Sequence, residues 1–259
     1  MKTRAGIQSV EVGYALLQVL AQGQGPLMLR DLAAAAGMSA AKAHRYLVSY
    51  QRLGLVQQDD ASTRYDLGPA ALALGLAALS RQDAVQMARA RMPALMQDIG
   101  HTVALAVWGN HGPTIVHWQE GAQAMSSLRL GDVMPLLTSA TGRCFTAWLP
   151  AARTAAQLKA EHATAQKMGR RDVPTTQAEV KTMLAEVRAQ GIARVVDTLL
   201  PGVVGLCAPV FDADGHLVLG MLSLGPRVIF DDASDGAPAQ ALRGAARQLS
   251  LDLGHRPRP

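Results

Sequence analysis

The chain has 259 residues, of which 49% are hydrophobic and 17% charged. This composition excludes a disordered chain, and the length is sufficient for two domains. A net charge of +5 favours polyanionic partners. The most apolar run, residues 69–80, is too short to cross a bilayer, and the N-terminus shows no signal-peptide pattern. The sequence therefore predicts a cytoplasmic protein with no membrane partner.

The first 68 residues have the pattern of a small helical module followed by a hairpin. Apolar residues at helical spacing predict helices over 9–20, 29–36 and 39–53, the last of them capped by Ser39 and ended by Gly54. Two short extended pieces follow around the turn Asp59-Asp60-Ala61-Ser62. This order of elements is that of a winged helix-turn-helix, and we expect it to form a domain over residues 1–68.

The next segment is a helix that is apolar on every side. Pro69 is a good first helical residue, and the run from there to residue 80 is almost entirely Ala, Leu and Gly. Because such a helix must be covered, a partner subunit is the expected cover, and residues 69–82 are predicted to be a linker and dimerisation helix. A further helix carries an apolar stripe from Val85 to Ile99, with a kink expected at Pro93.

From residue 100 the apolar period changes to that of strands. We predict a second domain over residues 83–259 with strands on one side and helices on the other. The expected strands are 102–109 and 113–120, a third at Ser126 to Leu130, and a hairpin over 205–226 around Asp212-Ala213-Asp214-Gly215. The expected helices are 138–150, stopped by Pro150, 176–190, opened by a capping box of Thr176 and Glu179, and 237–253.

Five stretches in this order resemble the IclR family of bacterial transcriptional regulators. They are SVEVGYALLQVL, LRDLAAAAGMSAAKAHRYLVSYQRLGLV, TRYDLGPAALALG, LGDVMPLLTSATGRCFTAWLP and PGVVGLCAPVFDADGHLVLGMLSLGP. The resemblance implies an α+β protein with an N-terminal winged helix-turn-helix, a linker helix and a C-terminal GAF-like α/β domain that binds a small organic effector. It further implies a homodimer or dimer of dimers that acts on double-stranded operator DNA as a repressor or activator, with RNA polymerase as a further partner.

The helix over 39–53 is about 22 Å long and suits the major groove. Arg45 is the best base reader, because its guanidinium can bond guanine through two hydrogen bonds. Lys42 can reach a base or a phosphate, and His44 a phosphate. The full set of predicted DNA-binding residues is Arg30, Ser39, Ala40, Ala41, Lys42, His44, Arg45, Ser49 and Arg64.

The members of this set differ in their expected roles. Ala40 and Ala41 can contact thymine methyl groups, whereas most family members have polar residues there. Arg30 and Arg64, on the second helix and the wing, are candidates for phosphate or minor-groove contacts. A helix-turn-helix can also be a protein-docking module, and residues 1–68 are only mildly basic, with seven Lys and Arg against five Asp and Glu. The wing and the matching order favour DNA.

Carried over from the family, the predicted effector-binding residues are Leu128, Met134, Ser139, Ala140, Thr141, Val195, Val203, Gly205, Leu222 and Leu224. Family members that bind small organic acids have an acidic residue, a cysteine and two serines where this chain has Val195, Gly205, Leu222 and Leu224. The apolar replacements favour a larger or less polar effector, such as an aromatic acid. Its carboxylate could bind backbone N–H groups at the start of the helix over 138–150.

Catalytic and metal sites have weak support. His101, His111 and His117 fall within one hairpin region, but surface or hairpin roles are the favoured interpretation. Cys144 and Cys207 match no zinc or disulfide spacing and are expected to be core residues. No catalytic residue, metal or cofactor is predicted. The alternative hypothesis is a small-molecule hydrolase, or a ligand-binding sensor whose helix-turn-helix docks a protein.

Overall fold

The computed structural model describes residues 6–23, 25–80, 83–121 and 128–256. Contacts divide the chain into two compact units, Met1–Gln82 and Asp83–Pro259. Each unit has a hydrophobic core of its own. Among the described residues, no helix is long and apolar enough to cross a membrane.

The first unit is a winged helix-turn-helix followed by one further helix, as predicted. Leu16, Leu32 and Leu47, one from each of the first three helices, are fully buried together and form its core with Val56 and Tyr65. The two strands pair antiparallel as the wing. In chain order the elements are α1 (Gln8–Gln22), α2 (Leu29–Ala35), α3 (Ala40–Arg52), β1 (Val56–Gln58), β2 (Tyr65–Leu67) and α4 (Pro69–Ser80).

Two local features set the angle of α3. Gly37 has a φ of 68°, a left-handed conformation that glycine adopts without strain, and it ends the turn after α2. Ser39 is the N-cap of α3, and its hydroxyl accepts a hydrogen bond from the N–H of Lys42. The turn and the cap therefore hold the third helix at a fixed angle to the second.

The second unit begins with two short helices, α5 (Ala84–Arg89) and α6 (Met92–Ile99). The prediction of one kinked helix over this stretch was wrong. Asp83 caps α5, and Pro93 lies in the first turn of α6, where the missing N–H of proline leaves no hydrogen bond unmade. Proline therefore starts a helix here and does not bend one.

A five-stranded antiparallel sheet forms the centre of the second unit, in the order β4-β3-β7-β6-β5. Both predicted hairpins are present. The predicted third strand is not: Ser126 and Ser127 lie outside the described residues, and Leu128–Leu130 form an irregular segment and a turn. The strands are β3 (Thr102–Gly109), β4 (Gly112–Gln119), β5 (Ala193–Val196), β6 (Val203–Phe211) and β7 (Leu217–Pro226).

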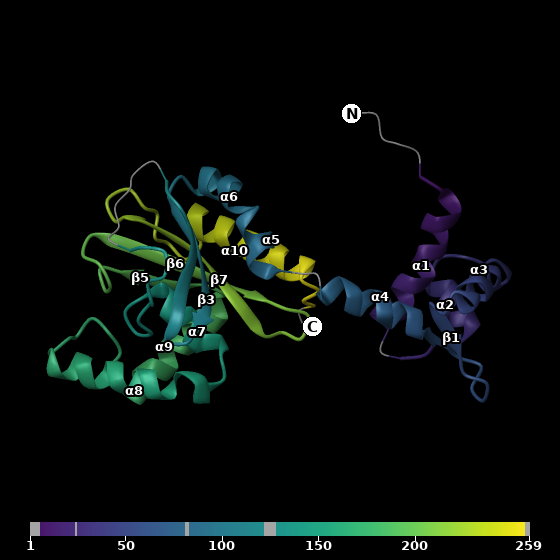
Figure 1. Ribbon diagram of the computed structural model, residues 1–259, viewed down its shortest axis with the longest axis horizontal. Helices are drawn as coiled ribbons and strands as arrows, with labels where there is room; N and C mark the ends of the chain where they lie inside the picture. The colour runs from purple at the N-terminus through teal and green to yellow at the C-terminus, as the bar shows by residue number, and fades with distance from the viewer. Residues whose placement is uncertain (1–5, 24, 81–82, 122–127, 257–259) are drawn as a thin grey trace. The chain divides into compact units, whose positions relative to one another are not determined.

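Helices cover both faces of this sheet (Figure 1), so the prediction of helices on one side was wrong. Leu206 of β6 packs in a core shared with α6 and α10, whereas its neighbour Cys207 packs in a core shared with α7 and α9. A strand buried on both faces has a continuous apolar run and no alternation. The remaining helices are α7 (Ala140–Trp148), α8 (Ala151–Lys167), α9 (Gln177–Gln190) and α10 (Ala237–Asp252).

The helix α8 was not predicted. Pro150 does follow the end of α7, but it is also the N-cap residue of α8, so that the two helices are separated by only two residues. By contrast, the predicted capping box of α9 is present, with Thr176 and Glu179 each bonding the backbone of the other.

Candidate functional sites

The exposed face of α3 is the first candidate site. Ala43 and Leu47 are buried against the core, and the opposite face of the helix is exposed. Ser39 caps the helix, as expected, and the Ser49 hydroxyl donates to the carbonyl oxygen of Arg45 at 3.3 Å. The predicted residues exposed on this face are Ala40, Ala41, His44, Arg45 and Ser49, with Lys42 half-buried beside them.

Positive charge on this face is carried mainly by arginine. The Arg45 guanidinium has no hydrogen bond or ion pair within the described residues, so all its donors remain for a ligand. Arg52 lies seven residues further on, which is two helical turns along the same side, and is also exposed. The sequence interpretation missed Arg52, although its spacing from Arg45 was a sufficient signal.

The two outlying arginines are partly engaged. Arg30 forms an ion pair with Asp31 at 3.8 Å, and both side chains are exposed, so the pair is weak. Arg64 precedes β2, and its Nη1 donates to the carbonyl oxygen of Pro26 at 3.1 Å. This bond fixes the direction in which the wing presents its guanidinium.

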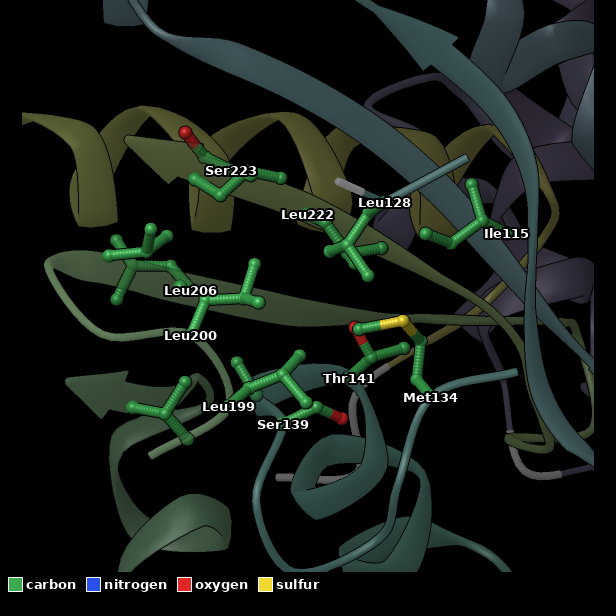
Figure 2. A pocket seen from close by; sticks show the side chains of 15 residues that line it. Ile115, Leu128, Met134, Ser139, Thr141, Leu199, Leu200, Leu206, Leu222 and Ser223 are labelled. Atoms are coloured by element: carbon green, nitrogen blue, oxygen red, sulfur yellow. The ribbon is translucent and has the colours of Figure 1, made fainter. Parts of the chain in front are cut away.

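The second candidate site is a cavity in the second unit, between the first turn of α7 and strands β5, β6 and β7. It is called the central cavity below. All ten predicted effector-binding residues line it, and Figure 2 shows several of their side chains gathered around one space. Five further residues that the sequence interpretation missed also line it: Ile115, Leu199, Leu200, Leu206 and Ser223.

The central cavity is almost entirely apolar. None of the described residues that line it is charged. The Ser139 hydroxyl donates to the carbonyl oxygen of Pro135 at 2.6 Å and accepts from the N–H of Gly142 at 2.8 Å, and the Ser223 hydroxyl donates to the carbonyl oxygen of Thr102. The Thr141 hydroxyl makes no hydrogen bond within the described residues, which leaves it as the free polar side chain of the cavity.

The start of α7 offers a second polar element there. Ser139 is the N-cap of this helix and satisfies the N–H of Gly142, whereas the N–H groups of Ala140 and Thr141 have no acceptor within the described residues. Unpaired N–H groups at a helix N-terminus favour negative charge. This arrangement can receive one carboxylate beside an apolar body.

The central cavity is narrow. Its volume is only about 40 Å³. Gly205 contributes to this space, because a Cβ at that position would lie 3.3 Å from Val195 Cγ2 and 3.7 Å from Ala140 Cβ. A ligand the size of an aromatic acid therefore needs the side chains around the cavity to move apart.

The structure does not place the three hairpin histidines in a common site. His101 stacks on Phe230 at 4.6 Å between ring centroids, and burial lowers its pKa. His111 is exposed in the turn, and His117 lies opposite Leu105 in the sheet. Among the described residues, three other side chains lie close enough together to share a metal ion. They are Asp212, Asp214 and His216, in the connection between β6 and β7.

The two cysteines are core residues, as expected. Both side chains are completely buried. Burial raises the pKa of the Cys207 thiol well above its usual value, and the neighbouring Cys144 thiol adds to this shift. A protonated and inaccessible thiol is not a nucleophile.

A winged helix-turn-helix joined to a sheet domain with an internal apolar cavity is the architecture of a class of protein, the helix-turn-helix transcriptional regulators. Residues 9–60 match the IclR helix-turn-helix domain, and residues 76–251 match the bacterial transcriptional regulator IclR C-terminal domain. The chain belongs to the IclR family of transcriptional regulators, which are not enzymes.

Individual relatives agree with this assignment over nearly the whole chain. The glycerol operon regulatory protein of Streptomyces griseus is 34% identical over 253 residues, which are 96% of this chain and 97% of the relative. The crystal structure of HmgR from Pseudomonas aeruginosa is 36% identical with a TM-score of 0.88, covering 96% of this chain and 99% of that one. The repressor BlcR of Agobacterium tumefaciens, at 21% identity and a TM-score of 0.76, covers 97% and 99% and shares the fold.

Proposed function

We propose that the chain is a regulator whose binding to operator DNA is set by an apolar or aromatic organic acid in the central cavity. The observation that carries this proposal is the cavity lining: apolar side chains, no charged residue among those described, and one free hydroxyl on Thr141 beside two unpaired backbone N–H groups. An aromatic acid would place its ring among the leucines and its carboxylate at the first turn of α7.

The proposal assigns a role to each segment. Residues 1–68 read DNA, residues 69–82 link and dimerise, and residues 83–259 bind the effector. In the DNA-binding domain, residues 1–68, which we call the reading head, Arg45 would recognise a base, with Lys42 and Arg52 supporting it. Ala40 and Ala41 would lie against thymine methyl groups or simply allow close approach. Arg30, His44 and Arg64 would contact phosphates.

Dimerisation would supply the cover that α4 lacks within one chain. Leu72 and Leu74 of this helix are each 65% exposed. Large apolar side chains at this exposure favour burial against a second copy. A dimer, or a dimer of dimers, would place two reading heads on one operator, so that each head needs few specific contacts.

The test is a thermal-shift screen of aromatic and aliphatic carboxylic acids on the full chain, followed by operator binding with and without the ligands that stabilise it. We expect aromatic acids to raise the melting temperature and to change operator affinity. Stabilisation by two- or three-carbon keto acids with no response to any aromatic acid would overturn the proposed effector class.

A further inference from the structure

A second groove lies in the same unit, on the edge of the sheet between α9 and α10. It is called the α9–α10 groove below. This groove has a volume of about 420 Å³, against about 40 Å³ for the central cavity. The central cavity and the α9–α10 groove share no lining residue. The groove therefore has the size of a small-molecule site without any rearrangement.

The groove exists because β5 is shorter than β6. The pairing of these strands ends at Ala193 opposite Cys207, so β6 continues to Phe211 without a neighbour on that side. On this unpaired edge, Pro209 has no backbone N–H and therefore needs no partner strand. The backbone N–H of Phe211 donates to the Ser250 hydroxyl of α10 at 3.0 Å. The sheet edge is thus satisfied internally and forms a stable floor.

Three arginines line the α9–α10 groove, and none of its described lining residues is acidic. Arg188 Nε donates to the carbonyl oxygen of Ala147 at 2.7 Å, and Arg243 Nη1 donates to that of Ser234, also at 2.7 Å. These bonds hold two guanidinium groups in place and leave most of their donors unused. None of the three arginines, Arg247 included, has a carboxylate partner among the described residues.

Aromatic side chains line one side of the groove, and two of them have unpaired hydrogen-bonding groups. Trp148 packs edge-on against Phe211 with ring centroids 5.0 Å apart, and Phe211 packs against His255 at 5.2 Å. Trp148 Nε1 and His255 Nδ1 are buried and have no hydrogen-bond partner in the part of the chain that the structure describes. Buried indole N–H groups normally donate to an acceptor. The aromatic side chains of the groove therefore offer ring faces for stacking and a donor that still needs an acceptor.

We propose that the α9–α10 groove binds a second ligand, a planar ring compound that carries a carboxylate or phosphate group. Arg188, Arg243 and Arg247 hold the anionic group, and the ring lies against Trp148 and Phe211. Guanidinium groups bind both carboxylate and phosphate through paired hydrogen bonds. The described lining of the central cavity offers no charged side chain, so a strongly anionic ring compound should favour the α9–α10 groove.

The experiment uses the full chain with 5-fluorotryptophan at its three tryptophans, followed by ¹⁹F NMR. Trp148→Phe assigns the Trp148 resonance. The probes are phenyl phosphate, benzoate and adenosine 5′-monophosphate, with inorganic phosphate for the anion alone and phenol for the ring alone. We expect a ring-bearing anion to shift the Trp148 resonance saturably with millimolar or tighter affinity, and more tightly than inorganic phosphate or phenol. The comparison of benzoate with the two phosphates identifies the anionic group.

Arg247→Gln is the informative variant, because this side chain makes no hydrogen bond to any of the described residues. It should weaken binding about tenfold, whereas Lys167→Gln, which removes the same charge at the end of α8, should leave binding unchanged. Gly205→Val, which fills the central cavity, should not affect the titration, and this separates the two sites. The proposal is overturned if no probe shifts the Trp148 resonance, if inorganic phosphate binds as tightly as the ring compounds, or if Arg247→Gln and Lys167→Gln bind equally.

Discussion

Val195 of β5 lies directly opposite Gly205 of β6, and the missing side chain of Gly205 leaves the space that the central cavity occupies. We expect Gly205→Val to fill this space. Its Cβ would begin 3.3 Å from Val195 Cγ2, so the two side chains must adjust slightly, at a cost of about 1–3 kcal/mol in unfolding free energy. The effect of aromatic acids on operator affinity should be lost, while operator binding without ligand persists.

Operator titration with and without an aromatic acid, together with a melting curve of the ligand-free variant, checks this prediction. The melting curve shows that the variant folds. If an aromatic acid changed the operator affinity of Gly205→Val as it changes that of the unmodified protein, the effector would have to bind elsewhere in the unit.

The Thr141 hydroxyl lines the same cavity without a hydrogen bond among the described residues. Thr141→Val keeps the shape and removes the hydroxyl, so we expect about tenfold weaker binding of a carboxylate effector with little change in stability. Ser139→Ala is the matched comparison, because its hydroxyl bonds the backbone of Pro135 and Gly142 and its loss should lower stability instead. Equal ligand affinity in Thr141→Val and the unmodified protein would exclude the hydroxyl as an anchor.

Arg45 is exposed in the middle of α3 with an unpaired guanidinium. We expect Arg45→Ala to remove operator-specific binding, at a cost of about 1–3 kcal/mol per half-site, and to leave weak, salt-sensitive binding to any DNA. Footprinting and titration at two salt concentrations measure both components. Arg30→Ala is the control: a phosphate contact there should weaken binding to all sequences alike. Unchanged operator affinity in Arg45→Ala would refute the assignment.

The sequence predicts the reading head well, because its helices are short, amphipathic and separated by Gly37 and Gly54, and because Ser39 supplies a cap. The fold of residues 83–259 is harder to predict from the sequence. Its central strands are buried on both faces, so their apolar runs do not show that helices lie on both sides. β5 has only four residues, one of them the exposed Arg194, and it gave no strand signal of its own.

The lining of the central cavity was likewise predicted only in part. Its ten predicted residues came from the family resemblance, which carries three-dimensional information that periodicity lacks. Leu199 and Leu200 were missed because they lie in the connection between β5 and β6, and a connection cannot be placed when one of its strands is unrecognised. The α9–α10 groove likewise depends on where the pairing of β5 stops, which no local pattern reveals.

The exposed leucines of α4 test the proposed dimer. Leu72→Glu with Leu74→Glu places one charge on each of two nearly opposite sides of α4. A second copy that covers either side would meet a charge in place of an apolar side chain worth about 1.5–3 kcal/mol when fully buried. We expect the double variant to be monomeric by light scattering and to bind a two-half-site operator at least tenfold more weakly. Leu130→Glu, at an equal 65% exposure in the effector unit, is the control and should not change the molecular mass. An unchanged mass in the α4 variant would place the interface elsewhere.

The buried pair Cys144 and Cys207 yields a prediction about reactivity. Since burial raises the pKa of the Cys207 thiol, this group stays protonated at neutral pH, and its partner Cys144 is equally inaccessible. A thiol reagent such as Ellman's reagent should therefore label neither cysteine in the native protein, and both in guanidinium chloride. Any slow labelling of the native protein should follow the rate at which α7 separates from the sheet, because both thiols lie in the core between them. An effector bound beside α7 should slow this labelling further, whereas fast labelling of the native protein would show that α7 does not pack on the sheet as described.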